Sequence, residues 1–410
     1  MSIEQTYIAK NGTKVIYRHK KRKYDFNHVI FVFSGFLNAK PGNYDFANAL
    51  NDCPCDVIWI CDNFEEMYTY YLCINMDFRV EEAVAEFMQH MLDSLGLNIS
   101  QSTTTGFSKG GSAALYYGLK YNIPNIVATV PQLKIGSYIE KNWRHVAEHM
   151  MSPNYSIANK NFMDKLLPKL LMTDAFLERN IYLLTSEADE QYEVEIKPYV
   201  NYFYKYKNFN YLKTYSAFVR DHGSVTGHHT ALLLGIYYAL ASEATPRYGN
   251  GQVDFFGSQP HSNPKPSGDP YVDLRMLRIT GDRLFVDGVA LLRGYDVAEY
   301  SDLNYELKLD SGKEISTLPL AKGNQPLLTK QFFDGEYLTI YDKAVFTTYQ
   351  HKGIDLSALP KGTYKLLIEI KLKNNMTDIQ EVKSERGLPG LESGKYKVFV
   401  MNGVYYLTVS

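Results

Sequence analysis

Hydrophobic and polar residues follow two different periods along the chain, and the change of period divides it in two. Through residues 1–245, short continuous apolar runs alternate with segments in which apolar residues recur every three or four positions. The first kind of run is typical of strands buried on both faces, and the second of amphipathic helices. Strands that alternate with helices favour a parallel sheet covered on both sides. The pattern therefore predicts an α/β fold with a doubly wound, mostly parallel sheet.

The individual elements follow from the same pattern. We expect strands at 13–17, 28–33, 56–60, 100–105, 125–130, 181–185 and 212–219. Helices are expected at 80–95, 111–119, 192–206 and 230–244, with Gly96 ending the first of them. Residues 135–178 have a helical pattern without strands, and they lie where such a sheet often carries a lid. We therefore expect a helical lid insertion after the strand 125–130.

The second half of the chain begins after a break in composition. Residues 246–269 are rich in Pro, Gly, Ser and Asn, and they predict an extended linker. From residue 270 to 410 the period becomes two, with turn residues at Asp287-Gly288, Asp310-Ser311-Gly312 and Asn402-Gly403. Such spacing indicates antiparallel hairpins. We expect a small all-β sandwich here, without a catalytic constellation.

A candidate nucleophile lies between the strand 100–105 and the helix 111–119. The segment Gly106-Phe107-Ser108-Lys109-Gly110 has the pattern G-x-S-x-G, which places a serine on a sharp turn from strand to helix. The serine needs strained backbone angles so that its hydroxyl stands clear of the sheet. The flanking glycines are required because a Cβ there would collide with neighbouring backbone. The motif predicts Ser108 as the nucleophile.

A serine nucleophile needs a general base, and the base needs a carboxylate to orient it. In this architecture the acid and then the histidine follow the serine along the chain. The loop 131–134 holds no carboxylate, whereas the loop after the strand 181–185 contains Glu187 and Asp189. Asp189 lies four residues past the strand and is the first candidate, and Glu187 is the second.

Three of the ten histidines follow the last predicted strand, where the base is required: His222, His228 and His229. His222 lies three residues past the strand and precedes a glycine, which suits a base on a loop. It is the first candidate, and His228 and His229 remain alternatives. Zinc binds imidazoles, but a serine in G-x-S-x-G needs no metal, and we expect none.

The negative oxygen that forms in acyl transfer needs two backbone N–H donors. We expect one from Lys109, directly after the nucleophile, and the other from Gly35 or Phe36, after the strand 28–33. The side chain of Lys109 has two open interpretations. Its charge attracts an anionic substrate or a cofactor phosphate, or it points into solvent.

Composition narrows the class of protein. A net charge of −2 gives no electrostatic footprint for nucleic acid. Residues 1–23 lack the apolar segment of a signal peptide, and no apolar run approaches the ~20 residues of a transmembrane helix. The four cysteines, Cys53, Cys55, Cys61 and Cys73, lack the spacing of a zinc or thioredoxin-like site. We expect reduced thiols in a cytoplasmic protein.

The motif at 106–111 and the histidine-containing loop at 222–229 resemble those of α/β-hydrolases, over ~240 residues, and within them bacterial capsular-polysaccharide and surface-glycan O-acetyltransferases. The resemblance implies that an acetyl group passes from acetyl-CoA to Ser108 and then to a sugar hydroxyl, with His222 as base and Asp189 as its orienter. It implies a polysaccharide acceptor and an acyl-CoA donor, with cofactor-binding residues unassigned. It also implies a place in the cytoplasm, peripheral to the inner face of the membrane beside the capsule machinery.

Two other functions compete with this one. A serine esterase that deacetylates glycans uses the same three residues but transfers the acyl group to water. A non-catalytic glycan-assembly or carbohydrate-binding protein on a hydrolase scaffold needs none of them. The intact serine motif and the histidine loop argue against the last function.

Overall fold

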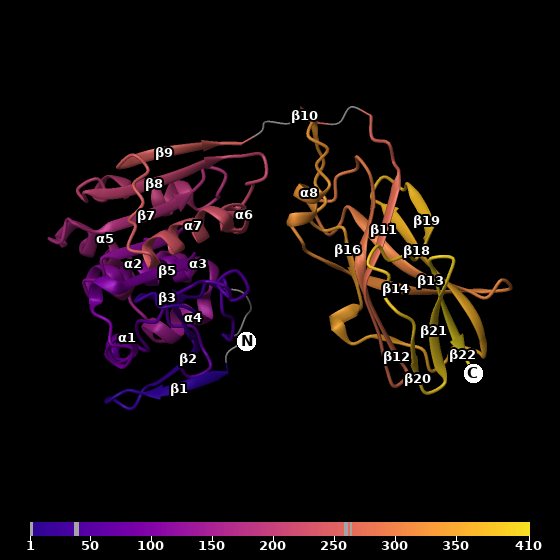
Figure 1. Ribbon diagram of the computed structural model, residues 1–410, viewed down its shortest axis with the longest axis horizontal. Coiled ribbons are helices and arrows are strands. Elements are labelled where there is room, and N and C mark those ends of the chain that lie inside the picture. Colours follow the sequence, from indigo (N-terminus) through magenta and orange to yellow (C-terminus); the bar gives the residue numbers. More distant parts are fainter. Residues whose placement is uncertain (1–2, 37–40, 258–260, 263–264) are drawn as a thin grey trace. The chain divides into compact units, whose positions relative to one another are not determined.

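The computed structural model describes residues 3–36, 41–257, 261–262 and 265–410, which fold into two compact units (Figure 1). The units are Met1–Ser258 and Gln259–Ser410. Each has its own hydrophobic core. The first unit holds every candidate residue named above.

One sheet of nine strands forms the centre of the first unit, in the order β1-β2-β4-β3-β5-β6-β7-β8-β9. The strands β1 and β2 pair antiparallel, as do β2 and β4, and every pair from β4 to β9 is parallel. The mostly parallel sheet predicted from the sequence is therefore confirmed. The strands are β1 (Glu4–Ile8), β2 (Lys14–Lys20), β3 (Val29–Phe33), β4 (Asp56–Ile60), β5 (Ser102–Phe107), β6 (Asn125–Thr129), β7 (Asn180–Thr185), β8 (Asn208–Tyr215) and β9 (Gly251–Phe256).

Helices cover both faces of this sheet, and successive strand residues point to opposite cores. In β3, Phe31 and Phe33 join the core under α1, α2 and the helices of the insertion, whereas Ile30 and Val32 pack with α7. Burial on both faces explains why these strands are continuous apolar runs. The helices are α1 (Arg79–Leu95), α2 (Lys109–Lys120), α3 (Ile135–Asn142), α4 (Arg144–Met151), α5 (Ile157–Thr173), α6 (His222–His228) and α7 (Thr230–Ala241), with a short 3-10 turn η1 (Ile99–Gln101).

Two segments near the candidate acid and base differ from the expected elements. Residues 192–206 form a π-helical turn η2 (Tyr192–Ile196) and a 3-10 turn η3 (Val200–Tyr202) instead of one helix. Pro198 lies between them and lacks the N–H that a continuing helix needs. The histidine loop contains a short helix, α6, that begins after Asp221, whose side chain accepts the backbone N–H of Ser224. That N-cap was already encoded in the sequence.

The predicted linker 246–269 contains a strand of the first unit. Strand β9 pairs parallel with β8, and its Val253 and Phe255 pack against the core on the α7 side. The alternation of apolar and polar residues in β9 is short, and glycines lie at both ends of it, so the segment looks like part of a linker in the sequence. The first unit therefore extends past residue 245.

One large antiparallel sheet forms the core of the second unit, and the predicted sandwich is wrong. Its strands follow the order β11-β12-β16-β14-β13-β18-β22-β21-β20, with β17 beside β12 and β19 beside β18. The sheet curls until β11 lies against β20, and the N–H of Leu274 in β11 donates to the carbonyl of Lys383, after β19, at 2.7 Å. The result is a nearly closed barrel. Hairpin turns and a period of two occur in sandwiches and barrels alike, so the sequence pattern does not separate them.

A bulge after Leu274 bends the long strand β11 and helps this sheet to coil. The short strands β10 and β15 pair parallel to each other in a separate sheet of two strands. The elements are β10 (His261–Ser262), β11 (Pro270–Thr280), β12 (Arg283–Leu292), β13 (Leu303–Asp310), β14 (Ile315–Gly323), α8 (Leu327–Gln331), β15 (Tyr337–Leu338), β16 (Val345–Thr347), η4 (Tyr349–His351), β17 (Ile354–Asp355), β18 (Gly362–Leu372), β19 (Thr377–Glu381), β20 (Leu391–Ser393), β21 (Tyr396–Met401) and β22 (Val404–Val409).

Candidate active site

Ser108 lies on a tight turn between β5 and α2, with φ 56° and ψ −122°. Positive φ is strained for a residue with a side chain, and such strain gathers at functional sites. The glycines around the serine allow the backbone to approach closely. A Cβ on Gly106 would lie 2.2 Å from the carbonyl carbon of Gly110, and one on Gly110 would lie 2.0 Å from the carbonyl oxygen of Phe33. The turn therefore presents a serine at the carboxyl end of β5.

A carboxylate holds the ring of His222. The Nδ1 atom of His222 lies 2.9 Å from Oδ2 of Asp189, which is buried. The other oxygen of Asp189 accepts the backbone N–H of Gln191 at 2.8 Å, and the backbone N–H of His222 donates to Glu190 at 3.0 Å. With Nδ1 turned to the carboxylate, Nε2 is the atom that accepts a proton.

The ring of His222 lies beside the nucleophile turn. Its centroid is 5.0 Å from that of Phe107, the residue before Ser108. The Nε2 atom is buried and forms no hydrogen bond with Ser108 or with any other described residue. A buried nitrogen without a partner is unusual and calls for a functional reason. Nε2 of His222 has such a reason if it takes up a proton during the reaction.

The alternative acid and bases have other partners. His229 is buried: its Nε2 bonds to the hydroxyl of Thr214, and its Nδ1 lies 2.5 Å from the carbonyl oxygen of Val225. Burial lowers the pKa of the His229 imidazole. The ring of His228 stacks on Phe218, with centroids 6.3 Å apart. Glu187 is exposed and forms an ion pair with Lys213. The structure thus brings His222 and Asp189 together and gives His229 and Glu187 different roles.

The candidate oxyanion donors are not equivalent. Lys109 is the first residue of α2, so its N–H is one of those that a helix leaves without an internal partner. The N–H of Gly35 already donates to Oδ2 of Asp45 at 2.7 Å. Phe36 stacks on Trp143, with centroids 4.3 Å apart. The backbone N–H groups of Lys109 and Phe36 are therefore better candidates than that of Gly35.

Both expectations for the Lys109 side chain are wrong. Its Nζ lies 2.7 Å from Oδ2 of Asp62, and both side chains are at most 1% exposed. The ammonium group also lies 4.5 Å from the ring centroid of Tyr71 and 5.0 Å from that of Tyr68. The sequence gives no sign of this pair because its members are 47 positions apart. The charge of Lys109 is therefore paired with a carboxylate inside the protein, away from solvent.

Gln132 belongs to the site although no sequence motif marks it. Its side-chain nitrogen lies 2.6 Å from Oγ of Ser108. The residue lies in the loop 131–134 after β6, the neighbour of β5 in the sheet. The loop holds no carboxylate, but it carries a polar amide, and that amide is the signal in the sequence that points to Gln132.

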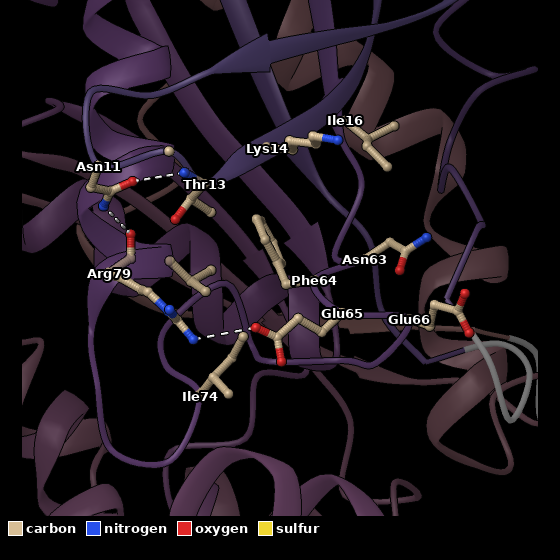
Figure 2. A pocket seen from close by; sticks show the side chains of 12 residues that line it. Asn11, Thr13, Lys14, Ile16, Asn63, Phe64, Glu65, Glu66, Ile74 and Arg79 are labelled. Carbon is tan, nitrogen blue, oxygen red and sulfur yellow. Dashed lines mark hydrogen bonds and ion pairs between the residues drawn. The ribbon is translucent and has the colours of Figure 1, made fainter.

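A cavity of about 510 Å³ lies past the end of β4 and is separate from these residues (Figure 2). Its lining includes Asn11, Asn63, Glu65 and Arg79, but not Ser108, Asp189 or His222. Figure 2 shows some of its polar groups paired with one another: Arg79 bonds to Glu65 at 3.2 Å, and Asn11 donates to the carbonyl oxygen of Arg79 at 2.9 Å. We assign no ligand to this cavity.

Other features of the first unit bear on the kind of chemistry. In the described ranges, no three His, Cys, Asp or Glu side chains form a group suited to a metal ion. All four cysteines are buried free thiols. Among the helices that the structure describes, none is both long and apolar enough to cross a membrane.

Comparisons with known proteins find likenesses among solved structures. No protein-family model and no curated protein sequence matches it. The capsule O-acetyltransferase of Neisseria meningitidis serogroup A is 21% identical, with a TM-score of 0.46 over 56% of this chain and 98% of that one. A histidine-to-alanine mutant of the same enzyme has been solved in complex with CoA, at 19% identity and a TM-score of 0.44 over 56% of this chain and 98% of that one.

Serine hydrolases match over a similar part of the chain. The fluorophosphonate-binding serine hydrolase FphF of Staphylococcus aureus is 10% identical, with a TM-score of 0.45 over 59% of this chain and 98% of that one. At such identities the likeness concerns the fold. The chain is thus structurally similar to capsule O-acetyltransferases, serine hydrolases and esterases of the α/β-hydrolase fold. The sequence resemblance and the structural likeness concern the same group of proteins.

Proposed function

We propose that the protein is a serine acyltransferase that moves an acetyl group from acetyl-CoA to a hydroxyl of a bacterial capsular or surface polysaccharide. One observation carries the proposal. His222 is bonded to buried Asp189 through Nδ1, and its buried Nε2 has no partner among the described residues although the ring lies beside the nucleophile turn. A base held in this tautomer is suited to take the proton of a serine hydroxyl.

The first half-reaction forms an acyl-serine. Oγ of Ser108 attacks the thioester carbonyl carbon, and Nε2 of His222 takes the hydroxyl proton. Asp189 stabilises the resulting imidazolium, and the N–H groups of Lys109 and Phe36 donate to the negative carbonyl oxygen. When this intermediate collapses, the carbon–sulfur bond breaks, and the CoA thiol leaves with the proton from His222.

The second half-reaction frees the serine. A sugar hydroxyl attacks the ester carbonyl carbon while Nε2 of His222 takes its proton. The bond from the carbonyl carbon to Oγ of Ser108 then breaks, and His222 returns the proton to Ser108. The products are the sugar acetate ester and the original enzyme.

The donor, the acceptor and the location belong to the proposal through the motif resemblance. The acyl donor is acetyl-CoA, and the acceptor is a glycan made by a capsule-type machinery. The protein works in the cytoplasm at the inner face of the membrane. The second unit positions the polymer, a role argued from its fold class alone.

A serine esterase that acts on acylated glycans is the second candidate, since water can replace the sugar hydroxyl in the second half-reaction. Ser108 is 4% exposed, and a site that excludes water favours transfer over hydrolysis. A non-catalytic glycan-binding protein would not need the bond between His222 and Asp189.

The products separate these functions. Purified protein is incubated with acetyl-CoA, with and without a capsular polysaccharide, and free thiol, acetate and polymer-bound O-acetyl groups are measured. A transferase releases thiol and acetylates the polymer. An esterase releases acetate, together with thiol when the ester is acetyl-CoA and without thiol when it is an O-acetylated polymer, and a binding protein releases neither thiol nor acetate. The Ser108→Ala variant should release neither product. Thiol release that persists in this variant would contradict the proposed nucleophile.

A further inference from the structure

We propose that Gln132 is a further catalytic residue, whose side-chain amide donates to Oγ of Ser108 and directs the hydroxyl proton toward His222. This inference rests on the proposed function of the site. It concerns how the nucleophile is held, which neither the serine motif nor the acid and base determine.

The contact fixes what the serine hydroxyl does. A hydroxyl carries one donor and two acceptor positions, whereas an amide nitrogen only donates. The bond of 2.6 Å from Nε2 of Gln132 therefore occupies an acceptor position on Oγ of Ser108. The hydroxyl proton stays free to be given away, and Nε2 of His222 is the buried acceptor without a partner.

Neighbouring groups hold the amide in this orientation. The hydroxyl of Tyr70 donates to Oε1 of Gln132 at 3.2 Å, and the second N–H of Gln132 donates to Oε1 of Gln191 at 3.0 Å. With the oxygen on the Tyr70 side, the nitrogen faces Ser108. The side chains of Gln132 and Tyr70 are fully buried, so no water competes for these bonds.

Helix α2 fixes the backbone of Gln132 as well. The hydroxyl of Ser112 donates to the carbonyl oxygen of Gln132 at 2.7 Å and accepts its N–H at 2.9 Å. Ser112 lies one helical turn after Ser108. The nucleophile and the residue that contacts it are therefore held by the same helix.

Strained backbone marks each segment that meets at this contact. Ser108 has φ 56°, Tyr70 has φ 54°, and Val130, two residues before Gln132, has φ 41°. A positive φ is a particular outlier for a β-branched residue such as valine. Strain of this kind persists only where the surrounding structure enforces it. At Val130 it turns the chain sharply after β6, and Gln132 follows on the far side of that turn.

The test uses the full chain and the labelling of Ser108 by a fluorophosphonate, measured as a rate at several pH values. Replacing the amide with an apolar group of similar size in Gln132→Leu removes the donor. It should slow labelling about 10- to 100-fold, the scale of one lost hydrogen bond to the negative charge that develops on Oγ as its proton leaves. Gln89→Leu makes the same substitution on the exposed face of α1 and should label at the wild-type rate.

The Gln132→Glu variant gives a signature that a purely structural residue would not produce. A protonated carboxyl still donates to Ser108, but an ionised one does not. The wild-type rate should rise with pH and then level off, because a general base acts only in its unprotonated form. In Gln132→Glu the rate should instead fall at high pH, as the introduced carboxyl ionises, so that the profile becomes bell-shaped. Burial delays that ionisation toward neutral pH.

The outcomes separate the two proposals. Wild-type protein that is not labelled at Ser108 would overturn the proposed function, and this inference with it. If the wild type is labelled, and the Gln132→Leu and Gln132→Glu variants are labelled at the same rate as the wild type, the role of Gln132 alone is overturned. A Gln132→Glu variant that is uniformly slower, with the pH profile of the wild type, would also overturn it.

Discussion

Lys109 and Asp62 form a buried ion pair, with Nζ of the lysine 2.7 Å from Oδ2 of the aspartate. The other oxygen of Asp62 accepts the hydroxyl of Thr69 at 2.7 Å and the backbone N–H groups of Thr69 and Tyr71 at 3.0 and 3.3 Å. The residue after the nucleophile is thereby joined to the segment that follows β4. That segment includes Tyr70, which orients Gln132.

Breaking this ion pair should be costly. Lys109→Met leaves the Asp62 carboxylate buried without its cation, which we expect to lower the free energy of unfolding by about 3–5 kcal/mol. Asp62→Asn combined with Lys109→Met removes both charges, so it should cost less than the sum of the two single variants. Urea unfolding of the three variants measures this coupling.

The control for the ion pair is Lys197→Met, which removes an exposed pair with Glu193 and should leave the free energy of unfolding nearly unchanged. Additive costs for the two single variants would contradict the coupling. So would a Lys109→Met cost no larger than that of the control.

Two histidines should give opposite results. His222→Ala removes the group bonded to Asp189 and should lower the rate of Ser108 labelling by several orders of magnitude, the scale of losing a triad member. His229→Ala removes a buried ring bonded to Thr214 and Val225, so it should lower stability and leave the labelling rate of the folded protein within about tenfold. Labelling rates and unfolding midpoints of both variants decide the matter. Loss of labelling in His229→Ala with full labelling in His222→Ala would show that the base is misassigned.

Glu195 should make stability depend on pH. Burial raises the pKa of its carboxyl to about 7, and it accepts the backbone N–H of Lys134 at 2.8 Å. Between the usual value of about 4.3 and that pKa, the folded state holds a proton that the unfolded state releases. The contribution of Glu195 to the free energy of unfolding is therefore full below about pH 4 and is lost as the pH rises through 7.

The Glu195→Gln variant cannot titrate at this position. Its free energy of unfolding, minus that of the wild type, should therefore increase from about pH 5 to about pH 8. Urea unfolding at both pH values measures the difference. Glu193→Gln, an exposed neighbour, serves as the control and should show no such trend. A difference that does not change with pH in Glu195→Gln would contradict the buried carboxyl.

The sequence predicts the strands and helices of the first unit well because their apolar residues must face two cores. It also points to Ser108, Asp189 and His222, because the serine motif and the order of strands limit where an acid and a base can follow. Gln132 and Asp62 escape prediction. Their roles depend on contacts between distant segments, and a lone polar residue in a loop carries no motif. The barrel of the second unit is not predictable from the sequence for another reason. The alternation of apolar and polar residues along a strand is the same in an open and in a nearly closed sheet.

The boundary between the units leads to a further prediction. A chain that ends at Ser258 keeps β9, whose Val253 and Phe255 pack on the α7 side, whereas a chain that ends at Ala244 loses it. We expect the first to fold and to be labelled at Ser108, and the second to expose β8 and aggregate. Circular dichroism and labelling of both chains test this. Failure of a folded chain 1–258 to react would show that the second unit helps to build the site.

The central claim is that Ser108 accepts an acyl group from a CoA thioester with His222 as base. The most direct measurement is mass spectrometry of the intact protein and its peptides after incubation with acetyl-CoA and rapid acid quenching. We predict one acetyl group on the peptide that contains Ser108 in the wild type, and none in Ser108→Ala or His222→Ala. An acetyl group on another residue, or an acetylated Ser108 that forms equally well in His222→Ala, would contradict the account.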